Sequence, residues 1–289
     1  MLVCVGIITV KVGIVDERGR SSMTDLLLTV FLPCNILSAF FSTDRSLLPS
    51  FGIMLGISAG FLVFFYVLAQ FVLYRRVSPE QKKILVFGTL VTSANFLGIP
   101  VVENIYGPEA LPYVAIYLMP IRVTVWSVGI AIFSGGKGNI RNIVFHPCMI
   151  ATYIGLIFVI GGLTPPKLLS RLVFSLGNCT TPVSMLVVGN ILALVDPRKV
   201  ITKLTAYFTF IRLVFLPLLT MGILLIFRPD PVICGVSVIM SGMPAGVTTS
   251  ILADKYGADK ELASKVVFLT TLLSIVSAPL LAWLIQQAL

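Results

Sequence analysis

Ten apolar runs, each bounded by charged residues or by Gly/Pro turns, divide this chain almost completely. They cover approximately residues 1–15, 22–41, 50–74, 84–105, 110–133, 143–162, 171–194, 200–227, 231–253 and 264–286. A run of about 20 apolar residues spans the hydrocarbon core of a bilayer as one helix. Hydrophobic residues make up 57% of the 289 residues and charged residues only 11%, which excludes a soluble domain of this size. The predicted fold class is an all-α polytopic membrane protein with ten transmembrane helices.

Basic residues are distributed unevenly between the runs. If the chain weaves through the bilayer, 15 of the 21 Lys and Arg residues fall on one side and 4 on the other, while Arg122 and Arg212 lie inside runs. By the positive-inside rule the side with 15 is cytoplasmic, so both termini lie outside a plasma (cell inner) membrane. The net charge of +9 then reflects topology and indicates no nucleic-acid partner. The first run carries Lys11, and we interpret it as a short or truncated helix because no signal-peptide cleavage site follows.

Residues for soluble-type catalysis or metal binding are scarce. The five cysteines are scattered, with no CxxC pair, and the single histidine, His146, lies in a loop. Acidic residues lie near the ends of runs and not at their centres, and no GxxxxGKT loop is present. An intramembrane protease or lipid transferase would need deep acids or a deep His or Cys set. We therefore predict no enzyme, no metal site and no bound cofactor.

Matching features recur in the two halves of the chain. Pro33 matches Pro182, Tyr106 matches Tyr256 and Arg76 matches Arg228, at offsets of 149, 150 and 152 residues. Because five spans is an odd number, a second copy would enter the membrane upside down relative to the first. The sequence thus predicts a 5+5 inverted repeat, with one unit in residues 1–133 and the other in residues 143–289.

The fourth and ninth runs are interrupted at their centres. The fourth holds NFLGIP, from Asn95 to Pro100, and the ninth holds Gly242, Pro244 and Gly246. Proline and glycine break the helix, and lipid cannot satisfy the backbone groups that a break frees, so such breaks survive only against protein or a watery cavity. We expect the broken helices to cross at the midplane. The alternative is a pair of ordinary proline kinks.

Broken helices create ligand sites. Their N-terminal ends are expected to present free N–H groups to an anion, and their C-terminal ends offer carbonyls suited to a cation. Uncharged hydrogen-bonding side chains flank both breaks, namely Thr92, Ser93, Asn95, Ser241, Thr248, Thr249 and Ser250. Arg122 and Arg212 add cations that must face protein or water, and either could clamp a carboxylate. The alternative for each is a structural partner, either a half-helix C-terminal end or an acid such as Glu103. Asn190, in contrast, is expected to join helices and not to bind ligand.

These motifs resemble those of the auxin efflux carrier family. The resemblance rests on NFLGIPVVENIYG, MPAGVTTSILADKYG, TPVSMLVVGNILAL and FLPCNIL, together with Trp126, and covers about residues 26–284. It implies a ten-helix carrier in which helices 1, 2, 6 and 7 form a scaffold that often dimerises in the family. Helices 3–5 and 8–10 would form a transport domain that moves as an elevator. The loop at residues 134–147 is short, which matches bacterial-type permeases.

The resemblance also implies a function. Family substrates are organic anions, including auxins in plants and malate or malonate in bacterial members. By carry-over Asn95, Gly98 and Pro100 match the first crossover and Pro244 the second. With Gly246, Thr248 and Arg122 from the residue argument, these form the predicted substrate site. The predicted function is a secondary carrier of a small organic anion. A sodium-coupled bile-acid-type symporter and a non-transporting ligand sensor are the alternatives, and coupling to Na+ or H+ stays open.

Overall fold

The computed structural model describes residues 2–42, 48–94, 98–107, 110–133, 145, 147–193 and 200–288. Within these residues almost every regular element is a helix. The elements are α1 (Leu2–Lys11), α2 (Glu17–Leu26), η1 (Leu27–Phe31), α3 (Leu32–Phe41), α4 (Leu48–Leu68), η3 (Ala69–Leu73), α5 (Pro79–Leu90), α6 (Ile99–Tyr106), α7 (Leu111–Thr124), η6 (Val125–Gly129), α8 (Ile130–Phe133), α10 (Pro147–Gly161), α11 (Lys167–Asn178), α12 (Thr180–Leu192), α13 (Lys203–Phe210), η8 (Ile211–Phe215), α14 (Leu216–Phe227), α15 (Pro231–Ser241), α16 (Thr248–Lys255) and α17 (Lys260–Ala288). The η elements are single π-helical turns; η1, η6 and η8 lie inside longer helices, and η3 ends the helix that begins with α4.

Five helical stretches in the described residues are long and apolar enough to cross a membrane. They are Glu17–Ser38, Gly52–Leu73, Ile116–Phe133, Lys203–Phe227 and Lys260–Ala288. Each coincides with one of the predicted apolar runs, and the other runs fall on shorter helices. An all-α membrane protein with several spans agrees with the sequence analysis. The count of ten spans and the inverted repeat stay predictions.

Large apolar side chains on these helices face outward. Phe71 is 65% exposed, Phe227 is 77% exposed and Trp283 is 58% exposed. Water would penalise such a surface, whereas hydrocarbon chains accept it at no cost. The outward apolar faces therefore fit a lipid environment.

Helix starts follow ordinary capping chemistry. The Asp16 carboxylate accepts the Gly19 N–H at 2.7 Å and begins α2. The Asp230 carboxylate accepts the Val232 N–H at 2.9 Å and begins α15 beside Pro231. Each carboxylate satisfies an N–H group that the first turn leaves without an intrahelical acceptor.

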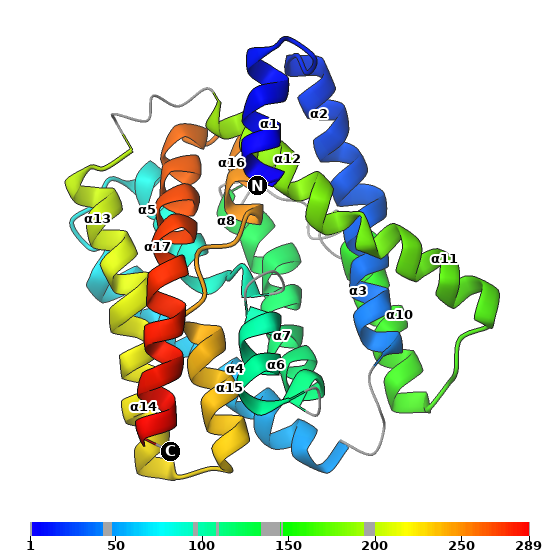
Figure 1. Ribbon diagram of the computed structural model, residues 1–289, viewed down its shortest axis with the longest axis vertical. Coiled ribbons are helices and arrows are strands. Elements are labelled where there is room, and N and C mark those ends of the chain that lie inside the picture. The colour runs from blue at the N-terminus through cyan, green and yellow to red at the C-terminus, as the bar shows by residue number, and fades with distance from the viewer. Residues whose placement is uncertain are drawn as a thin grey trace.

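The helices pack in two groups. In one group α1 packs along α12, and α3 packs against both α10 and α11. In the other, α4 packs against α7, α14 against α15, and α17 against α13 and α16. Figure 1 shows α3, α10 and α11 on the right of the molecule and α13, α14 and α17 on the left. Contacts of α12 with α16 and α17 join the two groups.

Two pairs of short helices in the second group follow one another in the chain with a break in between. The first consists of α5, with 12 residues, and α6, with 8. The second consists of α15, with 11 residues, and α16, with 8. Both α6 and α16 are followed by a glycine with positive φ, Gly107 at 80° and Gly257 at 67°, each directly after a tyrosine. A left-handed residue is a common way to end a helix, and glycine adopts it without strain.

Candidate functional site

The two interruptions lie against each other and share hydrogen bonds. Thr92, just after α5, pairs with Ala245, just before α16, in an isolated antiparallel bridge. The Ser93 N–H donates to the Pro244 carbonyl at 2.8 Å, and the Gly246 N–H donates to the Val91 carbonyl at 2.8 Å. Each break thus satisfies backbone groups of the other, which lipid could not do.

Gly246 allows this close approach. A Cβ atom at Gly246 would lie 2.7 Å from Cγ1 of Val91 and 3.2 Å from its carbonyl oxygen. A side chain there would push the two segments apart. Pro244 precedes it, and because proline has no N–H the chain loses one donor where the helix stops.

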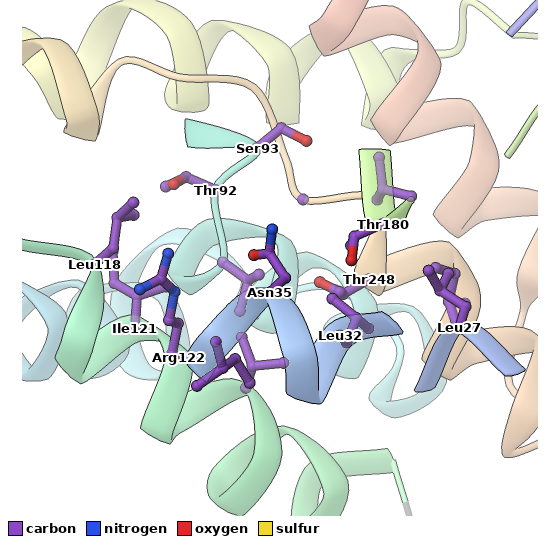
Figure 2. Close-up of a pocket in the computed structure, with 16 residues that line it drawn as sticks. Leu27, Leu32, Asn35, Thr92, Ser93, Leu118, Ile121, Arg122, Thr180 and Thr248 are labelled. Atoms are coloured by element: carbon purple, nitrogen blue, oxygen red, sulfur yellow. The ribbon is translucent and has the colours of Figure 1, made fainter. Parts of the chain in front are cut away.

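A cavity of about 80 Å³ opens beside the paired breaks. By the usual requirement of about 10–15 Å³ for one water, it holds several waters or a small molecule. Its polar lining comes from five segments: Asn35 on α3, Thr92 and Ser93 in the first break, Arg122 on α7, Thr180 on α12 and Thr248 on α16. Figure 2 shows these side chains around the cavity, with Leu27, Leu32, Leu118 and Ile121 supplying apolar walls.

Three hydroxyls at the cavity are buried without a hydrogen-bond partner in the described structure. They are Oγ1 of Thr92, Oγ of Ser93 and Oγ1 of Thr248. Two hydroxyls that follow Thr248, on Thr249 and Ser250, are also without a partner there. Buried polar atoms normally have partners, and a cluster of exceptions at one cavity indicates a site that a polar ligand or water completes.

Arg122 supplies the positive charge at this cavity. It lies on α7 directly before η6, and its guanidinium extends toward the segment that carries Thr92 (Figure 2). A guanidinium presents several N–H donors in one plane and matches a carboxylate well. The positive end of the α16 dipole lies on the same cavity at Thr248, and it adds a favourable field for an anion.

The expectation of free N–H groups at the helix starts is wrong for the first turn of α16. The Thr249 N–H donates to the Gly246 carbonyl at 2.9 Å, and the Ser250 N–H donates to the Val247 carbonyl at 3.0 Å. A tight turn at the start of the helix uses these donors internally. Anion recognition therefore depends on the arginine and the hydroxyls, with the dipole in a supporting role.

The structure brings together three of the predicted site residues, since Gly246, Thr248 and Arg122 all line the cavity. Pro244 does not line it but accepts the hydrogen bond from Ser93 that holds the breaks together. Gly98 packs against Met240 instead: a Cβ atom added at Gly98 would lie only 2.7 Å from Cε of Met240. Pro100 lies in the first turn of α6. Asn95 lies outside the described residues.

Sequence reasoning missed two polar lining residues, Asn35 and Thr180. The Asn35 amide donates to the Gly177 carbonyl at 3.4 Å, and the Thr180 hydroxyl donates to the Phe31 carbonyl at 2.9 Å. Both residues neighbour the prolines Pro33 and Pro182 of the repeat argument. The nearby prolines could have indicated these two residues, since proline interrupts the regular hydrogen bonding of a membrane helix.

Asn190 has the structural role that the sequence predicted. It is fully buried on α12, and its amide group lies 3.0 Å from the Thr9 hydroxyl on α1. The amide lies among several backbone carbonyls of α1 and α12, which suits the NH2 end of the side chain. This residue therefore joins two helices away from the cavity.

The outward apolar faces, the five membrane-length helices and the cavity with polar lining residues define a multi-pass membrane protein with an internal cavity. A family model described as "Membrane transport protein" matches residues 1–142 and 136–282. The chain belongs to this family, the auxin efflux carrier family that the sequence motifs indicated. Members of this family are transporters and not enzymes.

Two curated proteins are similar to the chain. An "Uncharacterized transporter" of Methanothermobacter thermautotrophicus is 26% identical over 97% of this chain and 94% of its own length. A "Putative malonate transporter" of Rhizobium meliloti is 30% identical over 52% of this chain and 47% of its own length. The first similarity extends over nearly the whole fold, and the second over about half of it.

Proposed function

We propose that this transporter is a secondary carrier of a small organic anion, and that the cavity beside the paired breaks is its substrate site. The observation that carries the proposal is the position of Arg122 on a small cavity with three buried hydroxyls that have no partner in the described structure. A carboxylate would accept hydrogen bonds from the guanidinium and from these hydroxyls together. On binding, the carboxylate would lose its hydrating water and gain hydrogen bonds from these fixed donors. The positive charge of the guanidinium favours an anion over a neutral solute.

The polar lining of the cavity favours a dicarboxylate. A dicarboxylate such as malonate or malate would place one carboxylate at Arg122 and the other near the hydroxyls of the same cavity. The malonate transporter named in the comparison supports the same substrate class, although it aligns with only 52% of this chain. We therefore rank malonate and malate ahead of auxin-like anions.

We further propose that the two interrupted spans cross at the bilayer midplane as members of an inverted repeat. Several facts support this arrangement. The first interruption separates helices of 12 and 8 residues, and the second separates helices of 11 and 8. The breaks pair in antiparallel fashion through Thr92 and Ala245, as two segments related by inversion would. Each shorter helix also ends at a Tyr-Gly pair with a left-handed glycine.

We propose that alternating access follows an elevator step. The cavity lies where the two packing groups meet, because Asn35 and Thr180 come from the group around α3 and α12, whereas Arg122 and Thr248 come from the other group. Displacement of one group along the other would carry the site across the membrane. In the numbering of the ten predicted transmembrane helices, helices 1, 2, 6 and 7 would then be the scaffold. Predicted transmembrane helices 3–5 and 8–10 would be the transport domain. A homodimer through the scaffold is part of this proposal.

Three further residues of the predicted site, Asn95, Gly98 and Pro100, are also part of the proposal for the substrate site. Asn95 follows the first break in sequence, and we propose that it contributes a polar contact to the substrate. Gly98 and Pro100 would set the start of the half-helix behind it. The plasma membrane, with both termini outside, is the proposed location, and it is supported by the 15-to-4 distribution of basic residues.

Uptake into proteoliposomes tests the proposal. The purified protein is reconstituted, and labelled malonate, malate, succinate and indole-3-acetate are supplied with and without an opposing anion inside. Saturable uptake of a dicarboxylate, lost in Arg122→Gln and kept in Arg171→Gln, is the expected result. Arg171 is an exposed arginine on α11 and serves as the matched control. Uptake of none of these anions, or equal uptake by the Arg122→Gln protein, would refute the substrate class or the site.

A further inference from the structure

The second membrane-embedded arginine, Arg212, lies at the carbonyl ends of the broken helices. It belongs to the π-helical turn η8 and is only 1% exposed. Its Nη1 atom donates to the Thr89 carbonyl at 2.9 Å, in the last turn of α5. Arg212 therefore binds one broken helix directly at the end where backbone carbonyls lack intrahelical donors.

The other broken helix ends at the same place. Ser241, the last residue of α15, and Leu90, the last residue of α5, line one small cavity together with Arg212. This cavity has a volume of about 10 Å³, which is enough for roughly one water. Thr92 and Ile121 belong to the walls of both this cavity and the larger one. The arginine thus lies next to the substrate cavity without lining it.

No acidic residue balances this charge in the described part of the chain. Nε and Nη2 of Arg212 have no hydrogen-bond partner there, and the ion pairs found among those residues involve other cations. A buried guanidinium without a counter-charge is costly in a membrane protein and indicates a specific role. The C-terminal end of a helix carries about half a negative charge, so two such ends supply about one. The charges of Arg212 and of the two helix ends balance approximately.

We propose that Arg212 is a built-in cation of the paired breaks, and that it occupies the place where a coupling metal ion would otherwise bind. In carriers with interrupted helices, unwound carbonyls and half-helix C-terminal ends are the groups that coordinate a cation such as Na+. Here a covalently attached guanidinium already binds the Thr89 carbonyl at that position. A metal ion added beside it would meet a like charge at close range. This inference rests on the proposed carrier function and specifies its coupling: anion transport proceeds without Na+.

Thermal stability of the purified protein, measured without any organic anion, tests the inference. The melting temperature is compared in NaCl, LiCl, KCl and choline chloride at equal ionic strength. The expected result is the same melting temperature in all four salts, within about 1 °C, because no metal ion binds selectively to the folded state. A saturable rise with Na+ over choline would overturn the inference. This measurement needs no substituted protein.

Substitution of Arg212 provides the second test. Arg212→Lys keeps the charge, so its melting temperature is expected to stay independent of the cation. Arg212→Gln removes the charge and leaves the two helix ends unbalanced, so Na+ or K+ is expected to raise its melting temperature by about 3 °C or more over choline. Arg122→Gln, which removes a cation at similar depth in the neighbouring span, is the matched control and is expected to show no such rise. A cation-independent Arg212→Gln protein, or a cation-dependent Arg212→Lys protein, would overturn the inference.

The outcome is separable from that of the proposed function. If the protein transports none of the anions tested but its stability does not respond to Na+, the carrier proposal fails and the assignment of Arg212 stands. If it transports malonate only with Na+ outside, the carrier proposal stands and the assignment of Arg212 fails. A glutamine variant that does not fold leaves the wild-type and lysine measurements to decide.

Discussion

The Nε atom of Arg20 lies 3.4 Å from Oδ2 of Asp254, and this ion pair joins the start of α2 to the end of α16. Asp254 also lies 3.4 Å from the Lys260 ammonium group. Ile251 lies about one turn from Asp254 on α16, and Leu27 lies about two turns from Arg20 in η1; both line the cavity beside the paired breaks. The Arg20–Asp254 ion pair therefore fastens α2 to α16.

The first prediction concerns Asp254. Its side chain is 16% exposed and that of Arg20 is 9% exposed, so Asp254→Asn leaves a largely buried cation with only the solvent-exposed carboxylate of Glu17 as its acidic partner. We expect a loss of about 1–3 kcal/mol in the free energy of unfolding, read as a lower melting temperature. Asp25→Asn is the control, because the Asp25 side chain in its pair with Lys255 is 59% exposed and its loss is expected to cost less than about 1 kcal/mol. Equal losses in both proteins would show that burial does not set the strength of these pairs.

The second prediction concerns Thr248. Thr248→Val removes a hydroxyl without a partner from the cavity wall while keeping the shape of the side chain. A lost hydrogen bond to a carboxylate is expected to weaken binding about 10-fold or more, with the melting temperature unchanged. Equilibrium binding of labelled malonate to the purified protein measures this. Thr209→Val, whose hydroxyl donates to the Thr205 carbonyl at 2.8 Å, is the control and should bind like the parent. Unchanged affinity in Thr248→Val would remove this residue from the site.

The third prediction concerns the contact between the two breaks. In Gly246→Ala the new methyl group would meet Cγ1 of Val91 at 2.7 Å, so the paired segments must separate. We expect a loss of about 1–3 kcal/mol in stability, together with impaired transport. Adding Val91→Ala removes the atom that the new methyl group meets, and it should restore part of the lost stability. Gly56→Ala, at a helical position with no neighbouring atom within 4 Å of the new methyl group, should be neutral or stabilising. A harmless Gly246→Ala would mean that the breaks need not touch.

The fourth prediction concerns Asn190. Replacing it with leucine removes the contact with the Thr9 hydroxyl and leaves buried polar groups of α1 and α12 without a partner. A loss of about 1–3 kcal/mol in stability is expected, with the dissociation constant of malonate unchanged. A weaker affinity at unchanged stability would contradict the structural role assigned to this residue.

The sequence predicted the second interruption well because Pro and Gly act locally, whereas the described non-helical residues of the first, 91–93, precede the predicted NFLGIP stretch. Pro244 and Gly246 stop a helix through their own backbone chemistry, and the break around them appears where the composition placed it. The sorting of charges placed Arg122 in the predicted site for an equally local reason, since an arginine in an apolar run must face something polar, and Arg122 does line the cavity.

Distant contacts were not predictable in the same way. Asn35 and Thr180 lie 145 residues apart and reach the same cavity only because α3 and α12 bring them there. A half-helix C-terminal end was one predicted alternative for Arg212, but the particular carbonyl was not predictable, since Thr89 lies 123 residues earlier in the chain. Every residue has a backbone carbonyl, so the sequence does not mark the one that Arg212 binds. Only the folded structure shows that Arg212 in η8 lies beside the last turn of α5.

The antiparallel pairing of Thr92 with Ala245 links the lengths of two segments that lie far apart in the chain. An insertion of one residue in either segment would displace its neighbour's hydrogen bonds and turn the following side chains to the opposite face. Among relatives of this protein, insertions and deletions at these two positions should therefore occur together or not at all.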